Sequence, residues 1–159
     1  MKASTLALAQ AAAVGGGGAE EAWANVIAEV PLFAGLSDRQ LRRIARLGTV
    51  QRFQPRSEVV TKGGVGDAAY IVLDGVCEVV RGRGRPRLAI GAGSIIGEMA
   101  LLDGAPRSGT VRATSEVTTL RLERKTFLRI IRDAPIVMLR LLETLATRVR
   151  EAEADTVPA

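Results

Sequence analysis

The run AAYIVLDGVCEVV, residues 68–80, sets the fold class of this 159-residue chain. Two stretches of β-branched and apolar residues flank an Asp-Gly pair, a pattern typical of two strands joined by a short turn. Gly75 tolerates the positive φ that a type I′ turn requires, so Asp74-Gly75 predicts a tight hairpin with a fixed register. The centre of the chain is therefore expected to be β-structure.

The same pattern of β-rich residues continues on both sides of this run. Between Thr49 and Leu122, brief β-rich runs are separated by Gly, Asp, Pro and Ser. The runs are TVQRF, EVVT, AAYIVL, VCEVV, RLAIG, SII, TVRAT and VTTLRL. So many short strands at close spacing favour a β-sandwich or a small barrel.

Helical periodicity precedes the strands. From Glu20 to Glu29 the apolar residues fall at helical spacing, and Pro31 ends that helix. The stretch LSDRQLRRIARL follows, with Ser37 as N-cap and Gln40 three residues later, which is the pattern of a capping box. We expect two short amphipathic helices here.

Helical periodicity also follows the strands, from Glu123 onward. We expect Asp133 to be the N-cap of a long terminal helix, with Pro135 in its first turn. This helix carries one apolar stripe at spacings of three and four residues. The stripe consists of Met138, Leu142, Leu145 and Val149. We expect it to pack on the strands or on a second copy of the chain.

Composition divides the chain into one domain with short ends. Residues 1–18 form an Ala- and Gly-rich leader that we expect to be flexible, residues 19–154 form the domain, and residues 155–159 form a frayed tail. The single cysteine permits no internal disulfide, which suits the cytoplasm. No apolar run approaches the ~18 residues needed to span a membrane, so none is expected to do so.

The absence of histidine excludes several classes of enzyme. No imidazole is available as general base, nucleophile activator or metal ligand, and Cys77 alone cannot build a thiolate metal site. We therefore expect no catalytic residues, no metal and no enzymatic activity. The net charge of +5 favours an anionic partner, without separating nucleic acid, acidic lipid and a small phosphate ligand.

The stretch GEMALLDGAPRSGTV, residues 97–111, has the residues needed to bind an anion. Gly97 lets backbone N–H groups turn inward between a short strand and a short helix. Arg107 supplies a planar cation that can donate two parallel hydrogen bonds to phosphate oxygens. A phosphate would then be held from two sides.

The other polar residues of this stretch suit a sugar. Glu98 would repel a phosphate, so its carboxylate must face hydrogen-bond donors such as sugar hydroxyls. Ser108 adds a hydroxyl beside the arginine, and Gly109 leaves room for close backbone contact. Together these groups predict a site for a ribose phosphate.

This stretch resembles the phosphate-binding cassette of the cyclic nucleotide-binding domain family, whose pattern runs from Phe-Gly-Glu through Ala-Leu to Pro-Arg-Ser/Ala/Thr-Ala-Thr-Val. Ile96 and Gly109 depart from the usual Phe and Ala. The resemblance covers about residues 23–150, including VPLFAGLSDRQL and KGGVGDAAYIVLDGVCEVV. It implies an α+β, mainly β fold: an antiparallel β-roll (jelly roll) with N-terminal helices and a long C-terminal lid helix.

The resemblance also implies a role for each site residue. Gly97 and Glu98 would meet the ribose, and Arg107 with Ser108 would hold the cyclic phosphate. Backbone and apolar contacts would come from Met99 and Ala100. Arg148 falls where bacterial channel members of the family place an arginine that caps the base. Its other interpretation is a solvated charge beside Glu151.

The function implied is a sensor or regulatory module that binds cAMP, with cGMP as the second candidate and no other cofactor. The terminal helix would close over the base, and the partners would be a second copy or an unknown effector protein. One alternative is a nucleic-acid-binding protein acting through RGRGRPR, Arg81 to Arg87, although its glycines and proline favour a solvated hairpin. Another is a structural relative that does not bind nucleotide. A cupin-type enzyme is a third, but its chemistry generally depends on histidine ligands.

Overall fold

Two four-stranded antiparallel sheets form a β-roll in the computed structural model, which describes residues 17–156 except 84 and 86. The strand order is β1-β8-β3-β6 in the first sheet and β2-β7-β4-β5 in the second. The strands are β1 Thr49–Phe53, β2 Glu58–Val60, β3 Ala68–Asp74, β4 Cys77–Val80, β5 Leu88–Ile90, β6 Ile95–Ile96, β7 Thr110–Ala113 and β8 Val117–Glu123. Each of the eight predicted runs matches one of them to within one residue at either end. The predicted antiparallel β-roll is confirmed, and the described strands do not close into a barrel.

Strand β3 is buried on both faces. It lies between β8 and β6 in the first sheet, and alternate side chains point to opposite sides. Ala69, Ile71 and Leu73 belong to the core under the helices, whereas Tyr70 and Val72 belong to the core between the two sheets. Burial on both faces explains why this strand is apolar throughout instead of alternating.

The predicted hairpin at Asp74-Gly75 is wrong. Strands β3 and β4 lie in different sheets and do not pair. Gly75 does have a positive φ of 93°, and a Cβ there would collide with the carbonyl oxygen of Glu116. Asp74 lacks the positive φ that a type I′ turn also requires, so the predicted turn type is wrong as well. Strands β8 and β6 occupy both edges of β3, so the chain crosses to the other sheet. The Arg81–Arg87 run does join an antiparallel pair, β4 and β5, as the hairpin interpretation expects.

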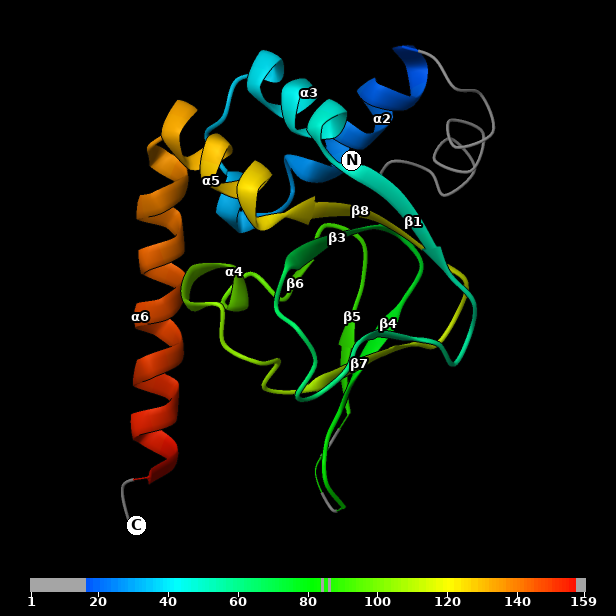
Figure 1. Ribbon diagram of the computed structural model, residues 1–159, viewed down its shortest axis with the longest axis vertical. Coiled ribbons are helices and arrows are strands. Elements are labelled where there is room, and N and C mark those ends of the chain that lie inside the picture. The colour runs from blue at the N-terminus through cyan, green and yellow to red at the C-terminus, as the bar shows by residue number, and fades with distance from the viewer. Residues whose placement is uncertain (1–16, 84, 86, 157–159) are drawn as a thin grey trace.

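The helices cover the outer face of the first sheet (Figure 1). They are α2 Gly17–Ile27, the 3-10 turn η1 Pro31–Phe33, α3 Asp38–Leu47, α4 Ala100–Asp103, α5 Arg124–Asp133 and α6 Ile136–Thr156. Helix α2 begins two residues before the expected domain boundary, and residues 1–16 of the leader lie outside the described part. Ser37 and Gln40 form the predicted capping box at the start of α3.

Asp133 does not cap the terminal helix as predicted. It is the last residue of α5, where the N–H of Ala134 donates to the carbonyl of Ile130, and α6 begins only at Ile136. The Asp133 carboxylate instead forms an ion pair with Arg43 of α3, at 2.8 Å. Asp133 is therefore bound to a neighbouring helix instead of to the first turn of α6.

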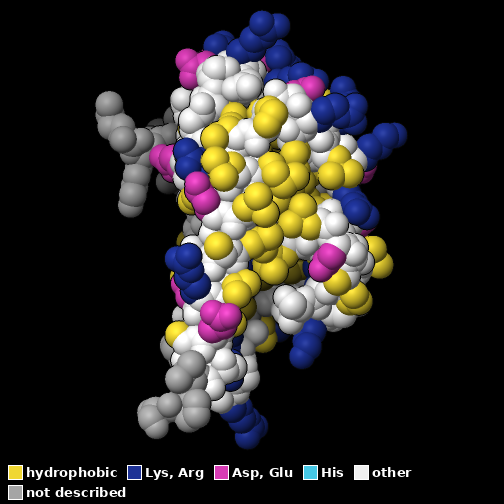
Figure 2. All heavy atoms as spheres, turned by 90° about the vertical axis from the view of Figure 1, so that its left-hand side faces the viewer, with side chains coloured by type: hydrophobic (Ala, Val, Ile, Leu, Met, Phe, Trp, Pro, Cys, Tyr) yellow, Lys and Arg dark blue, Asp and Glu magenta, His cyan; other side chains and the backbone are white. Residues whose placement is uncertain are grey.

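Helix α6 runs along one side of the molecule, next to α4 (Figure 1). Its packed face is formed by Val137 and Leu141, which are fully buried, with Leu145 packed against the same core. The other members of the predicted stripe, Met138, Leu142 and Val149, are exposed, so their predicted packing on the strands is wrong. Figure 2 shows apolar side chains gathered on this side. The described part of the tail, residues 155–156, continues the helix.

Candidate ligand-binding site

A cavity of about 550 Å³ opens between the β-roll and α6. This volume lies in the range of typical small-molecule sites, ~300–1,000 Å³. All eight residues that the sequence singles out line it, namely Gly97, Glu98, Met99, Ala100, Arg107, Ser108, Gly109 and Arg148. The fold therefore brings Arg148 of α6 to the same cavity as the loop that precedes β7.

The loop between β6 and β7 forms one end of the cavity. Gly97, directly after β6, has a φ of 82°, and a Cβ there would fall on the guanidinium of Arg107. Helix α4 follows but has only four residues, and Gly104 ends it with a φ of 66°. A single turn has little helix dipole, so the expected attraction for an anion must come from Arg107 and free backbone N–H groups.

Arg107 is buried, with 7% of its surface exposed. Its Nη1 donates to the carbonyl of Gly97 at 3.1 Å, and its Nη2 donates to the carbonyl of Ala68 at 2.5 Å. Its backbone is bonded to Gly63 and Gly64, which fixes the loop. No carboxylate of a described residue forms an ion pair with it. A buried guanidinium without a counter-ion is costly, and an anion in the cavity would remove that cost.

Glu98 is also buried, with 3% of its surface exposed. Its Oε1 lies 2.5 Å from Nη2 of Arg148, but the contact lacks hydrogen-bond geometry. Among the described residues this oxygen has no hydrogen-bond donor. Buried carboxylate oxygens are normally hydrogen-bonded, and this oxygen has only the ion pair with Arg148, so a ligand hydroxyl would add a hydrogen bond to it. Glu98 forms no ion pair with Arg107; its ion-pair partner is Arg148.

Arg148 reaches the cavity from α6. Besides the contact with Glu98, its Nη1 donates to the sulfur of Met99 at 2.6 Å. Its side chain remains 46% exposed, and Glu151 lines the cavity beside it without forming an ion pair with it. The alternative of a solvated charge beside Glu151 therefore does not describe its contacts.

The sequence analysis missed the apolar wall of the cavity. This wall comes from both sheets, and its members are Val60, Val79, Leu88, Ile90, Ile95, Ile96 and Val111. Val79 and Leu88 face each other across the β4–β5 pair. Apolar residues on both arms of the arginine hairpin were the available signal, because a fully solvated hairpin has no need of them. The wall offers an apolar surface to a flat ring.

Nothing in the described residues adds a metal site or a membrane span. No group of three or more cysteine or acidic side chains lies close enough to hold a metal ion in residues 17–156. Within the same residues, each helix is either too short or too polar to cross a bilayer. The cavity is thus the one place where the residues singled out from the sequence come together.

Comparison with known proteins gives a consistent family. Residues 50–134, just over half of the chain, match the sequence profile of the cyclic nucleotide-binding domain. The chain is 33% identical over 130 residues to the cyclic AMP receptor protein of Thermus thermophilus, an alignment that covers 79% of this chain and 60% of that protein. It is 33% identical over 113 residues to a cAMP-dependent protein kinase regulatory subunit of Emericella nidulans, covering 70% of this chain and 27% of that one.

A solved structure agrees with these relatives. The crystal structure of the Thermus thermophilus catabolite activator protein matches with a TM-score of 0.72 and 30% identity, covering 79% of this chain and 61% of that one. The chain therefore spans less than two thirds of the length of each of these proteins.

Proposed function

This chain belongs to the cyclic nucleotide-binding domain family, and we propose that it is a sensor module that binds cAMP in the cavity between the β-roll and α6. The family consists of ligand-binding regulatory domains, and none of the comparisons indicates an enzyme family. We propose accordingly that the chain has no catalytic activity. The observation that carries the proposal is the buried Arg107 guanidinium, which has no counter-ion among the described residues.

The proposed pose assigns one part of the ligand to each end of the cavity. The cyclic phosphate binds Arg107, which keeps unused N–H groups after its two bonds to backbone carbonyls, and Ser108 adds a hydroxyl. The ribose hydroxyl donates to Glu98, whose Oε1 has only the ion-pair contact with Arg148. The purine lies on the apolar wall. Each group of the nucleotide then meets a side chain of complementary chemistry.

Arg148 takes a double role in this proposal. In the structure the Arg148 guanidinium forms an ion pair with the Glu98 carboxylate, the group that binds the ribose in the proposed pose. Ligand entry therefore exchanges the Arg148–Glu98 contact for a hydroxyl–Glu98 hydrogen bond. The released guanidinium is then free to stack on the purine, so that α6 closes over the base. Closure follows only if the closed arrangement binds nucleotide better than the open one.

Calorimetric titration with cAMP and cGMP tests the proposal. We expect wild type to bind cAMP, and Arg107→Ala to bind it about 10- to 100-fold more weakly, because each charged hydrogen bond contributes ~1.5–3 kcal/mol. Arg112→Ala is the matched control, since Arg112 is an exposed arginine of β7 that pairs with Glu58 outside the cavity. Thermal unfolding of each variant separates lost binding from lost folding.

Other outcomes would identify another function. Equal heats for wild type and Arg107→Ala would contradict the assignment of the phosphate site. Absence of heat with both nucleotides would identify a structural relative that does not bind. Binding to nucleic acid that collapses with salt and survives Arg107→Ala would favour the arginine hairpin instead. Tighter binding of cGMP than of cAMP would correct the choice of base.

The partner we propose is a second copy of the chain. The outward face of α6 carries four apolar residues that are each at least 38% exposed, namely Met138, Leu139, Leu142 and Val149. Figure 2 shows apolar side chains gathered on this side of the molecule. Exposed apolar patches of this kind commonly mark protein interfaces. We expect the wild type to sediment as a dimer and Leu142→Glu as a monomer. If wild type stays monomeric at millimolar concentration, the dimer proposal is wrong, and an effector protein is the remaining candidate partner for this face.

A further inference from the structure

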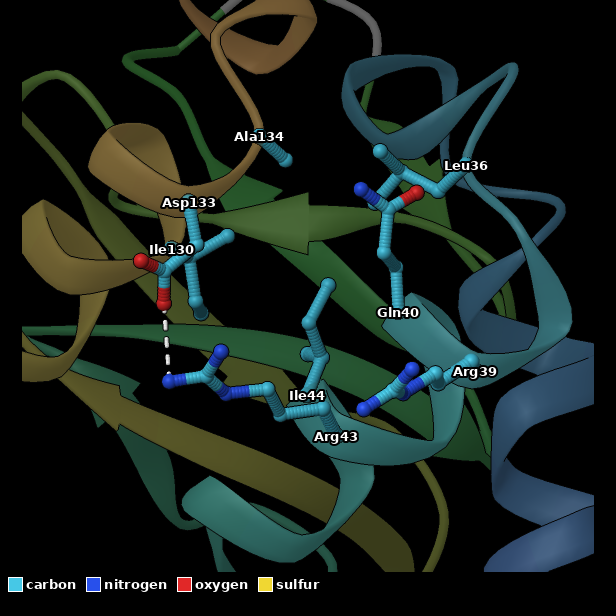
Figure 3. A pocket seen from close by; sticks show the side chains of 8 residues that line it. All are labelled: Leu36, Arg39, Gln40, Arg43, Ile44, Ile130, Asp133 and Ala134. Atoms are coloured by element: carbon cyan, nitrogen blue, oxygen red, sulfur yellow. Dashed lines mark ion pairs between the residues drawn. The ribbon is translucent and has the colours of Figure 1, made fainter.

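A second, smaller cleft lies between α3 and the junction of α5 and α6. Its volume is about 160 Å³, and it shares no lining residue with the large cavity. The residues around it are Leu36, Arg39, Gln40, Arg43, Ile44, Ile130, Asp133 and Ala134 (Figure 3). It is therefore a separate feature that the nucleotide site does not explain.

The floor of this cleft is apolar. Figure 3 shows Ile44 of α3 and Ile130 of α5 extending toward the space between the helices. Both belong to the main core, with 2% and 4% of their surface exposed, and Ala134 closes the far end. An apolar cavity of ~150 Å³ holds a benzene-sized guest. A cleft of this size therefore fits one aliphatic or aromatic side chain.

The rim of the cleft is positively charged. Arg43 is bound to Asp133 across the cleft, whereas Arg39 has no acidic partner among the described residues. Two further exposed arginines of α5, Arg129 and Arg132, directly precede Ile130 and Asp133 in the chain; they do not line the cleft themselves, and they form no ion pair within the described residues. A neutral or basic occupant would leave these charges without partners. The rim is complementary to carboxylates.

We propose that this cleft binds a peptide segment of a partner protein in which one aliphatic side chain is flanked by acidic residues. The aliphatic side chain fills the space above Ile44 and Ile130, and the flanking carboxylates pair with Arg39 and the neighbouring arginines. The apolar contact supplies affinity through buried area. The charges supply orientation and selection against basic segments.

The position of the cleft connects it to the nucleotide site. Ala134 lies between α5 and α6, so any displacement of α6 changes the width of the cleft. Partner binding and nucleotide binding then influence each other by the same factor. This link depends on the proposed function, whereas the docking itself does not.

Methyl-detected NMR of the full chain tests the docking with synthetic peptides. We expect acetyl-Glu-Asp-Leu-Asp-Glu-amide to shift the methyl signals of Ile44 and Ile130. The analogue with serine in place of leucine should not shift them, nor should acetyl-Lys-Lys-Leu-Lys-Lys-amide. Ile44→Val and Ile130→Val assign the signals. No shift at millimolar acidic peptide, or equal shifts with the serine analogue, would overturn the proposal.

A matched pair of charge reversals tests the rim. Arg39→Glu should weaken binding of the acidic peptide about fivefold or more, because the interaction between side chain 39 and the peptide carboxylates changes from attraction to repulsion. Arg83→Glu makes the same change on the exposed β4–β5 hairpin and should leave affinity within about twofold. Equal weakening by both variants would show a nonspecific effect of net charge and contradict the site.

Repeating the peptide titration with saturating cAMP tests the link to α6. If cAMP changes the affinity for the peptide in wild type but not in Arg107→Ala, the result supports the link. An unchanged affinity in a protein that binds cAMP rejects the link and leaves the docking intact. A protein that fails to bind cAMP but still binds the peptide contradicts the proposed function alone.

Discussion

At the scale of single residues, the site depends on the absence of a side chain at Gly97. Its φ of 82° lies in the region that costs other residues ~1–2 kcal/mol, and the space where a Cβ would lie holds the guanidinium of Arg107. Gly97 therefore allows both the turn and the position of Arg107, the residue proposed to bind the phosphate. A substitution at Gly97 should lower both the stability of the fold and the affinity for the nucleotide.

We expect Gly97→Ala to lower the free energy of unfolding by ~1–2 kcal/mol and to weaken cAMP binding by at least about tenfold, because the methyl group displaces Arg107. Urea unfolding and calorimetry measure the two effects. Gly91→Ala is the control, since Gly91 does not line the cavity and a methyl group there would meet no atom within 4 Å. Similar affinities for the two alanine variants would show that Arg107 tolerates the displacement.

The polar residues that line the site could be predicted from the sequence, but the apolar wall and the contacts between the polar residues could not. Short spacing and side-chain chemistry identified Gly97, Glu98 and Arg107, because the loop that holds them is local. The contact between Glu98 and Arg148 joins positions 50 residues apart, and only the docking of α6 creates it. The absence of a counter-ion at Arg107 likewise depends on everything packed around it.

At the scale of elements, local features could again be predicted from the sequence, whereas long-range packing could not. The capping box of α3 was predicted because Ser37 and Gln40 contact each other within one turn. The pairing of β3 was not, because Asp74-Gly75 specifies a turn and leaves open which strand lies alongside. The packed face of α6 was also partly misplaced: Val137 and Leu141 face the core with Leu145, whereas the other members of the predicted stripe, including Leu142, lie outside.

This difference between the faces of α6 predicts a difference in stability. Leu141→Ala should lower the free energy of unfolding by ~2–5 kcal/mol, because it leaves a cavity in the core beneath the helix. Leu128→Ala removes the same atoms from an exposed position on α5 and should change the free energy of unfolding by less than ~1 kcal/mol. Urea unfolding measures both. Equal losses would contradict the assigned face of α6.

At the scale of the whole molecule, the two sheets enclose a core that contains the single cysteine. Cys77 is fully buried in the core between the sheets, and burial raises the pKa of its thiol above the ordinary value. The folded state therefore retains the proton at a pH where the unfolded chain has lost it. Stability linked to this thiol is present below the unfolded pKa of ~8.5 and is lost as pH rises above it.

We expect the free energy of unfolding of wild type to fall between pH 8 and pH 10 more steeply than that of Cys77→Ala. The comparison removes the contribution of lysine and tyrosine, which titrate in both proteins. The native thiol should also react slowly with a disulfide reagent and rapidly in urea. Parallel pH profiles, or rapid reaction of the native protein, would show that the core between the sheets is open to solvent.

The most direct measurement is a crystal structure of the chain with millimolar cAMP. We expect the cyclic phosphate on Arg107, a ribose hydroxyl on the Oε1 of Glu98, and Arg148 moved from that carboxylate to the purine. An empty cavity, or a bound nucleotide whose phosphate lies away from Arg107, would contradict this expectation.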